Sequence, residues 1–293
     1  MYTAHGKAIL LGEHSVLYGS GALCIPLKTR VECYFVHETE WKITINDELF
    51  RDKKAFGQLI KILEDYSDTG HFSFETEIPP GAGLGFSAAI SNIFSQFCLR
   101  NSSPSLKDIN SLSYRFEQIF HKTPSGLDNT AVTYNSPVFV LSQTSSIKNM
   151  INLKHIHGNF YLTDINPEII TGFCGSVTPT SQMVETFRGL PDDKKAFFAT
   201  NIDSLISSFV KSYTDSDMKS CGQYLTESHR LLCEMKMSSP QLDEMVEIAL
   251  EAGAWGAKMT GGGGGGCVIS MAPPSKTEMI IKRWAENGYR TIG

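Results

Sequence analysis

A glycine-rich loop near the middle of the chain has the composition and the flanking pattern of an anion-binding site. Residues 71–78 before it alternate between apolar and polar side chains, as a half-buried strand does, and residues 90–98 after it repeat apolar side chains at helical spacing. Glycines let backbone N–H groups approach an oxyanion closely, and the following helix N-terminus adds about half a positive charge. The loop therefore predicts phosphate binding, with a tight turn before a capped helix as the alternative. It consists of Pro80, Gly81, Ala82, Gly83, Leu84, Gly85, Phe86, Ser87 and Ala88.

Ser87 stands where this helix is expected to begin. Its hydroxyl could cap the helix, or it could bind a magnesium ion that accompanies the phosphates, because magnesium prefers hard oxygen ligands.

Six consecutive glycines, residues 261–266, form a second unusual segment among the 25 glycines of the chain. The run matches the dinucleotide-binding pattern GxGxxG, but so does any polyglycine. A helix is expected before it and a strand, residues 267–271, after it, which is the reverse of the dinucleotide-binding order. Neither glycine segment continues into Lys-Ser or Lys-Thr, so the P-loop of nucleoside triphosphatases is excluded as well.

Composition narrows the class of protein. The 293 residues are 41% hydrophobic and 19% charged, which is typical of a globular chain and not of a disordered one. The net charge of −5 argues against binding to nucleic acid or to an anionic membrane. Seven widely spaced cysteines without a CxxC pair argue against a zinc site or a disulfide framework. With no membrane-span or signal-peptide pattern, we expect a cytoplasmic protein.

The pattern of side chains predicts strands mainly in the first part of the chain and helices mainly in the second. Extended segments are expected at residues 8–11, 23–36, 41–45, 71–78, 138–141, 160–165 and 267–271. Helices are expected over residues 90–98 and 106–121, around residues 202–210, and from Ser239-Pro240 to just before Gly253. The change from strands to helices suggests a domain boundary near residue 165, giving domains 1–165 and 166–293.

Four segments stand in a fixed order along the chain. They are GKAILLGEHSVLYG at residues 6–19, the central PPGAGLG loop, HKTPSGLDN at residues 121–129, and KMT at residues 258–260 followed by the glycine run. Together they resemble the GHMP kinases, a family that includes galactokinase, homoserine kinase, mevalonate kinase and phosphomevalonate kinase. The form GEHSVLYG and the step from Glu117 to Asp128 are most like the mevalonate kinase branch, and the resemblance covers nearly the whole chain.

The resemblance implies an ATP- and Mg²⁺-dependent kinase that phosphorylates the primary hydroxyl of mevalonate. Asp128 matches the catalytic aspartate, which would accept the hydroxyl proton, and Lys7 matches the lysine that would keep this aspartate ionised. Ser87 and Glu117 match the magnesium ligands. Without the family, Lys7 would be interpreted as a solvated cation, Asp128 as a turn residue and Glu117 as a charge on a helix surface.

Contacts with the acceptor substrate are implied for Glu13, His14 and Thr180, and Gly262 and Gly263 would line the same site. Thr180 is the loosest of these matches, and capping of a local helix is its alternative. The resemblance implies an α+β fold with two domains, an N-terminal one with a left-handed βαβ unit and a C-terminal ferredoxin-like one, with the active site in the cleft between them. A monomer or a homodimer is expected.

The chain departs from the family pattern at three positions. Phe86 replaces the first of two adjacent serines, Lys122 replaces a common glycine, and Gly262 replaces a common alanine. Lys122 would add a cation near the triphosphate if it points inward, and otherwise would be solvated. The change at Gly262 is expected to loosen the loop without altering its chemistry.

Two other functions stay open at this point. Another GHMP kinase is possible, although the GExxDY segment of galactokinases is absent and the decarboxylase branch lacks residues like Lys7 and Glu117. The other alternative is a non-catalytic protein of the same fold, which Phe86 suggests because it removes a hydroxyl from the glycine-rich loop.

Overall fold

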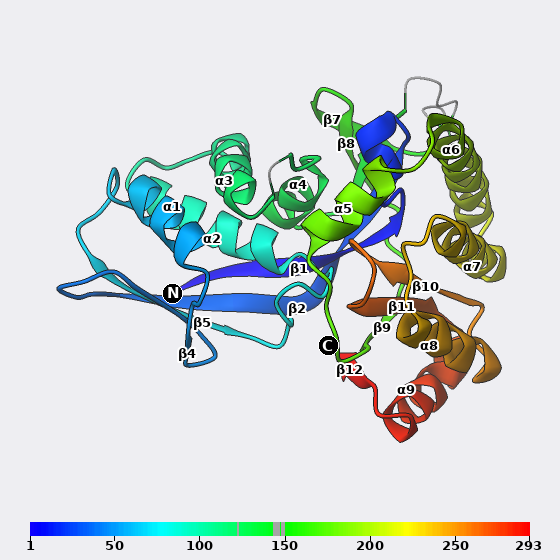
Figure 1. The fold of residues 1–293 in the computed structure, drawn as a ribbon. Helices are drawn as coiled ribbons and strands as arrows, with labels where there is room; N and C mark the ends of the chain where they lie inside the picture. Colours follow the sequence, from blue (N-terminus) through cyan, green and yellow to red (C-terminus); the bar gives the residue numbers. More distant parts are fainter. Residues whose placement is uncertain (122, 143–146, 148–149) are drawn as a thin grey trace. The chain divides into compact units, whose positions relative to one another are not determined.

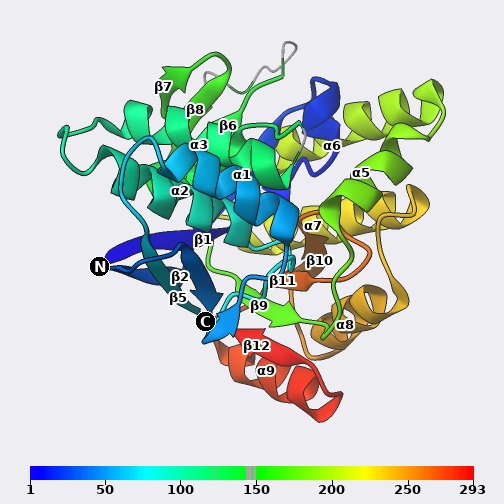
Figure 2. The same ribbon diagram turned by 60° about the vertical axis from the view of Figure 1, so that its left-hand side comes forward.

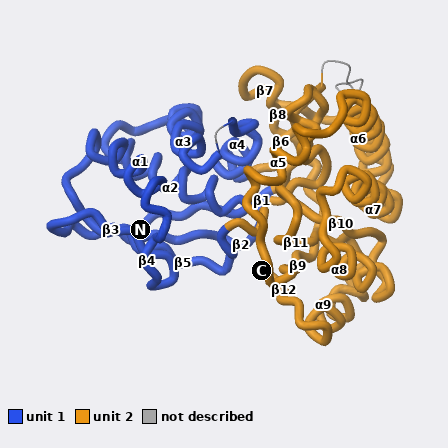
Figure 3. The backbone as a smooth tube through the Cα atoms, viewed as in Figure 1, with its two compact units in different colours: residues 1–7, 26–80, 85–135 blue, residues 8–25, 81–84, 136–293 orange. Residues whose placement is uncertain are grey.

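The computed structural model describes residues 1–121, 123–142, 147 and 150–293, and it divides into two compact units (Figures 1 and 3). Unit 1 comprises residues 1–7, 26–80 and 85–135, and unit 2 comprises residues 8–25, 81–84 and 136–293. Two strands, β1 (Tyr2–Leu11) and β2 (Ala22–His37), begin in one unit and end in the other. The units are interleaved along the chain, and the domain boundary near residue 165 stays a prediction.

Unit 1 is a sheet with helices over one face (Figures 1 and 2). The second half of β2 pairs antiparallel with β5 (Gly70–Thr76), β5 pairs parallel with β3 (Lys42–Ile45), and β3 pairs with β4 (Glu48–Leu49). The helices are α1 (Lys53–Leu63), α2 (Phe86–Leu99), α3 (Leu106–Phe120) and α4 (Leu127–Tyr134). Strand β3, helix α1 and strand β5 form a parallel βαβ unit, whose left-handed sense stays a prediction.

The core of unit 1 follows from the alternation in β5 and the helical spacing in α2. Phe72 and Phe74 point to one face and are fully buried. Their rings meet Phe94 of α2 edge to face, with centroids 5.0 and 5.5 Å apart, which is a favourable geometry for aromatic pairs. The half-buried strand and the helix expected on either side of the glycine loop are therefore confirmed.

Unit 2 contains a four-stranded antiparallel sheet with the order β10-β11-β9-β12. Its strands are β9 (Ile170–Phe173), β10 (Gly256–Thr260), β11 (Cys267–Met271) and β12 (Arg290–Ile292). Along the chain they alternate with helices as β-α-β-β-α-β, and this order confirms the ferredoxin-like expectation. The helices of unit 2 are α5 (Thr180–Arg188), α6 (Asp192–Thr214), α7 (Met218–Glu234), α8 (Pro240–Glu251) and α9 (Thr277–Glu286).

The remaining elements of unit 2 are short. Strand β6 (Val138–Val140) pairs with the first residues of β2 and with β8 (Phe160–Thr163), which pairs with β7 (Leu153–His157). Two 3₁₀ turns cover Ser15–Tyr18 and Pro274–Lys276. No helix among the described residues is long and apolar enough to cross a bilayer.

Several elements differ from the expectation because local pattern did not reveal them. Strand β1 begins at Tyr2 and includes Lys7, a polar residue that the structure buries among apolar neighbours. Helix α1 was not expected, although Asp52 caps it by accepting from two backbone N–H groups. The capping of α8 by Ser239, with Pro240 in the first turn, agrees with the expectation.

Helix α7 packs on β10 at a point where neither backbone carries a side chain. Gly222 of α7 faces Gly256 of β10, and a Cβ on Gly256 would lie 1.7 Å from the carbonyl oxygen of Gly222. Since that obstacle is backbone, it cannot rotate away. This pair of glycines therefore sets the distance between the helix and the sheet.

We expect Gly256→Ala to lower the free energy of unfolding by about 3 kcal/mol or more, because overpacking against backbone forces the helix off the strand. Urea unfolding followed by circular dichroism measures it. The matched control is Gly57→Ala in α1, where an added Cβ meets nothing within 4 Å. Alanine there should raise stability by about 0.5–1 kcal/mol. Equal effects of the two substitutions would contradict the packing argument.

Candidate active site

A buried ion pair lies at the centre of the predicted site in unit 1. Lys7 Nζ is 2.9 Å from Asp128 Oδ2, and the lysine side chain is 1% exposed against 32% for the aspartate. Strand β1 holds Lys7, and Asp128 lies in the first turn of α4. A Cβ on Gly85 would lie 2.7 Å from Lys7 Cγ, so glycine at that position, near the end of the predicted phosphate loop (residues 80–88), lets its own backbone approach the lysine. The structure thus brings together Lys7 and Asp128, as the sequence predicted.

A hydroxyl and a carboxylate meet in the same unit. Ser87 Oγ donates to Glu117 Oε1 at 2.8 Å, and Ser91 Oγ donates to Glu117 Oε2 at 3.1 Å. Glu117 lies near the end of α3 and is 1% exposed, so the interpretation as a charge on a helix surface is wrong. The N-cap of α2 is Gly85, with no side-chain cap, so the capping alternative for Ser87 is wrong as well.

The surroundings of the Glu117 carboxyl group disfavour its ionised form. Burial, with a smaller contribution from nearby Asp128, raises the pKa of Glu117 to about 7, although both serine hydroxyls and Lys7 favour its ionised form. A cation at this carboxylate would offset the cost of burying its charge.

His121 completes this cluster, and residue-by-residue reasoning did not assign it a role. Its Nε2 lies 3.2 Å from Ser87 Oγ and 3.3 Å from Glu117 Oε1. Burial lowers the pKa of His121 below its usual range. The only available signal was its place at the start of HKTPSG, a segment that was matched as a whole. Lys122, the next residue, lies outside the described residues.

The phosphate loop is divided between the units, and its glycines serve close backbone packing. In unit 2, a Cβ on Gly83 would lie 2.4 Å from the carbonyl oxygen of Thr260. Gly81, Gly83 and Gly85 all have positive φ angles, between 78° and 85°, a conformation that other residues rarely adopt. The predicted loop residues therefore adopt a backbone that only glycine supports at these positions.

A second buried ion pair lies in unit 2. Lys258 Nζ donates to Glu13 Oε1 and, at 2.6 Å, to the carbonyl oxygen of Met259. The side chain of Lys258 is fully buried and that of Glu13 is 1% exposed. Glu13 was predicted to contact a substrate, whereas Lys258 was noted only as part of KMT. The reason to expect a role for Lys258 is the buried carboxylate of Glu13, which needs a cation beside it.

His14 sits in a strained turn. Its φ of 59° and ψ of −46°, with a 2.6 Å hydrogen bond from Ser15 N to Glu13 O, describe a γ-turn of the rare, strained form. The imidazole Nε2 lies 2.9 Å from the carbonyl oxygen of Gly262, and the ring stacks on Phe187 at 5.2 Å. Because a carbonyl only accepts, Nε2 carries a proton. Strain of about 1–3 kcal/mol persists only where surrounding contacts fix the residue, and this is common at functional sites.

Hydrogen bonds hold the glycine run from both sides. Gly264 N donates to Met237 O at 2.8 Å, Gly264 O accepts from Thr178 Oγ1 at 2.7 Å, and Gly266 N donates to Ser176 O at 2.8 Å. Gly263 has a φ of 86°, and a Cβ there would lie 2.0 Å from Met237 O. The run is therefore a fixed wall of backbone rather than a linker.

Thr180 is the first residue of α5 and makes no capping bond, so its capping alternative is wrong. A Cβ on Gly262 would lie 3.1 Å from Thr180 Cγ2. Glycine in place of the common alanine thus leaves room for the threonine, which is a packing role and not the loosening expected from sequence. The structure brings His14, Thr180 and Gly262 together around one stretch of backbone.

Comparisons with known proteins agree with this geometry. Residues 53–136 match the model of the GHMP kinases N terminal domain, and residues 205–290 match that of GHMP kinases C terminal. Mevalonate kinase of Pyrococcus abyssi is 29% identical, with 94% of this chain and 90% of the relative covered.

Two solved structures share the fold. The L. major mevalonate kinase in complex with R-mevalonate superposes with a TM-score of 0.77 at 20% identity, covering 97% of this chain and 90% of that one. The Streptococcus pneumoniae phosphomevalonate kinase in complex with phosphomevalonate and AMPPNP gives a TM-score of 0.75 at 16% identity, covering 98% and 97%.

The two family models together match more than half of the chain. With the fold and the clustered residues described above, they give one conclusion: the chain belongs to the GHMP kinase family.

Proposed function

We propose that this protein is an ATP- and Mg²⁺-dependent kinase that transfers the γ-phosphoryl group to the primary hydroxyl of mevalonate. The observation that supports it best is the Lys7–Asp128 pair at 2.9 Å, buried beside a serine hydroxyl and a carboxylate. Phosphoryl transfer requires positioned groups and neutralised charge more than covalent chemistry, and this cluster offers both.

Asp128 acts as the proton acceptor. Its carboxylate is 32% exposed, so a substrate hydroxyl can reach it, whereas Lys7 is buried behind it. As the hydroxyl oxygen forms its bond to the γ-phosphorus, its proton passes to Asp128 and the bond to the ADP oxygen breaks. Lys7 fixes the carboxylate in place and places positive charge near the reacting oxygen.

Ser87 and Glu117 fit a magnesium ion. A hydroxyl oxygen and a carboxylate are the hard ligands that Mg²⁺ prefers. Burial raises the pKa of Glu117 to about 7, so a cation at this carboxylate would favour its ionised form. When bound, the ion would neutralise phosphate charge. The chain's own part is to hold both oxygens within hydrogen-bonding distance of each other, with Ser91 fixing the second carboxylate oxygen.

Backbone supplies the remaining phosphate binding. The loop of residues 80–88 leads into α2, whose N-terminus carries partial positive charge and no side-chain cap. Phe86, in the first turn, removes one hydroxyl that related kinases place there, but it leaves the backbone N–H groups of the helix start. A protein with net charge −5 can therefore bind a triphosphate without a basic surface.

The acceptor is proposed to bind Glu13, His14 and Thr180 next to the glycine run. Burial lowers the pKa of His14 to about 4, partly opposed by the hydrogen bond to Gly262 and assisted by the nearby charge of Lys258. His14 is therefore neutral at physiological pH and offers polar atoms without a charge. Mevalonate is favoured as acceptor because the Pyrococcus abyssi relative is named as a mevalonate kinase over 94% of this chain.

The acceptor can be identified by ADP release coupled to NADH oxidation, with mevalonate, phosphomevalonate, homoserine and galactose at equal concentration. We expect kcat/KM for mevalonate to exceed the others by at least about 10²-fold, because a polar site rejects analogues that leave its buried groups unpaired. Absence of turnover with mevalonate would refute the proposed acceptor, and absence with every substrate would refute the kinase.

Asp128→Asn should lower kcat by about 10²–10⁴-fold, since an amide cannot accept the proton. ATP affinity, measured by calorimetry, should change by less than about threefold, because the phosphate contacts are independent of this carboxylate. Asp192→Asn on α6, whose side chain is 99% exposed, is the matched control and should keep wild-type kcat. A fully active Asp128→Asn enzyme would contradict the assigned role.

His14→Gln should make the protein less sensitive to acid. The folded-state pKa of His14, about 4, lies below the unfolded value of 6.5, so the unfolded state binds more protons as pH falls. Wild-type stability should decline from about pH 6.5 to pH 4, by up to about 3 kcal/mol from this residue, at 1.36 kcal/mol per pKa unit. Glutamine retains a donor for Gly262 but does not titrate.

Urea unfolding of both proteins at pH 7.5, 6, 5 and 4 measures this difference. The free energy of unfolding of the wild type should fall toward that of His14→Gln as the pH falls, so that the difference between the two shrinks. A gap that is constant across this range would show that His14 is not buried as a neutral imidazole.

A further inference from the structure

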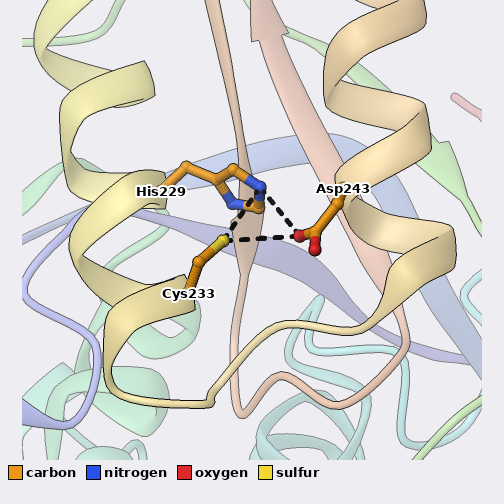
Figure 4. Close-up of side chains that lie close together, drawn as sticks. All are labelled: His229, Cys233 and Asp243. Atoms are coloured by element: carbon orange, nitrogen blue, oxygen red, sulfur yellow. Dashed lines mark hydrogen bonds and ion pairs between the residues drawn. The ribbon is translucent and has the colours of Figure 1, made fainter.

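Three side chains that the kinase site does not use converge between helices α7 and α8. His229 and Cys233 lie one helical turn apart on α7, and Asp243 lies in the first turn of α8 (Figure 4). Each offers one ligand atom, and all three atoms lie within 4.8 Å of one another. Cysteine spacing in the sequence argued against a zinc site, but spacing cannot reveal this cluster, because its members come from two helices and only Cys233 is a cysteine.

The triangle formed by these atoms has the dimensions of one face of a zinc tetrahedron. His229 Nε2 is 3.2 Å from Asp243 Oδ1 and 3.6 Å from Cys233 Sγ, and Cys233 Sγ is 3.4 Å from Asp243 Oδ1. Zinc bond lengths at tetrahedral angles give about 3.4 Å between nitrogen and oxygen and about 3.6 Å for each pair that includes sulfur. The observed edges agree to within about 0.2 Å.

The chemistry of the donors favours zinc over the magnesium that the kinase site would use. Thiolate and imidazole are ligands for Zn²⁺, whereas Mg²⁺ prefers oxygen alone. One thiolate and one carboxylate balance the charge of the ion, so the loaded site is neutral and compatible with partial burial. Asp243 is 45% exposed and Cys233 is half-buried, which leaves a route for the ion and a fourth position for water.

We propose that His229, Cys233 and Asp243 form a Zn²⁺ site that links α7 to α8. On binding, the ion forms bonds to Nε2, Sγ and Oδ1, the Cys233 thiol releases its proton to solvent, and the fourth ligand is water.

Binding must also change the tautomer of His229. The Nδ1 atom of His229 accepts a 3.4 Å hydrogen bond from Met259 N, so the proton is on Nε2 and faces Asp243. Zinc at Nε2 moves this proton to Nδ1, where it meets the N–H of Met259 donor to donor. The hydrogen bond from Met259 N is already long, and it is lost when zinc binds. Zinc binding therefore removes one contact between α7 and β10.

The His229–Cys233–Asp243 cluster lies next to the turn that supports the glycine run. The turn between α7 and α8 contains Met237, whose carbonyl accepts from Gly264 N at 2.8 Å, and Ser238, whose hydroxyl donates to Asp243 Oδ1. Zinc therefore fixes both ends of the turn that holds Gly264.

Cobalt titration of the untagged full-length protein tests the site. Co²⁺ reports zinc-type ligation through visible d–d bands and a near-ultraviolet thiolate charge-transfer band. We expect one equivalent to give both bands and one equivalent of Zn²⁺ to abolish them, while millimolar Mg²⁺ has no effect. Cys233→Ser should remove the charge-transfer band, and Asp243→Asn should weaken Zn²⁺ binding at least tenfold in competition with a chromophoric chelator.

The matched control is His155→Gln, an exposed histidine on β7 in the same unit, which should bind Zn²⁺ like the wild type. Asp243→Asn keeps the test valid if Cys233→Ser does not fold, because Asp243 is nearly half exposed. A cobalt complex without a thiolate band, or equal Zn²⁺ affinity in wild type and Asp243→Asn, would overturn the proposal.

Amide hydrogen exchange gives an independent readout. One equivalent of Zn²⁺ should accelerate exchange of the Met259 amide at least tenfold and leave the Ala257 amide unchanged, because Ala257 N donates to Thr226 Oγ1 and not to a ligand. Unchanged exchange at Met259 in the zinc-saturated protein would refute ligation through Nε2.

Discussion

A lysine ammonium is too costly to bury without a counter-charge, and the described part of this chain buries two, Lys7 and Lys258. Each has a carboxylate partner, Asp128 for the first and Glu13 for the second. Removing one partner of such a pair costs about 3–5 kcal/mol, because the other charge is left unpaired in a poor solvent. The positions of β1, α4 and β10 therefore depend on these two pairs, and the residues proposed for catalysis and substrate binding are held in place by the same interactions.

In the proposed phosphate site, backbone N–H groups replace the basic side chains that many phosphate-binding proteins use. A side chain at Gly83 would collide with Thr260 O, and one at Gly263 would collide with Met237 O. Glycine at these positions brings two stretches of main chain together without intervening side chains. The entropy cost of ordering glycine is high, and hydrogen bonds from Thr178 and to Met237 offset it. Glycine is thus required at these positions because two stretches of main chain pack closely there.

Sequence could predict those parts of the fold and site that are local. The alternation around Phe72 and Phe74 was sufficient to identify β5 and its buried face. Lys7 and Asp128, which are far apart in the sequence, were expected in one cluster only because of the resemblance to the GHMP kinases. What sequence could not predict depends on distant partners. The polar start of β1 is a strand because its sheet buries Lys7, and Lys258 has a role only because Glu13, more than two hundred residues away, lies against it.

The edge position of β10 explains why α7 carries the polar residues that it does. The outward N–H groups of an edge strand need acceptors when a helix excludes water from them. Thr226 Oγ1 accepts from Ala257 N at 3.1 Å, and His229 Nδ1 accepts from Met259 N. These side chains reach the strand only because Gly222 and Gly256 let the helix come close.

On the side of β1, Thr260 Oγ1 donates to Ile9 O at 3.1 Å and accepts from Ile9 N at 2.9 Å. Hydrogen bonds from α7 and from β1 therefore both fix β10. The glycine run begins directly after Thr260, so its first residue starts from a fixed point. A backbone wall of six glycines can be ordered in this way because the strand before it is held on both sides.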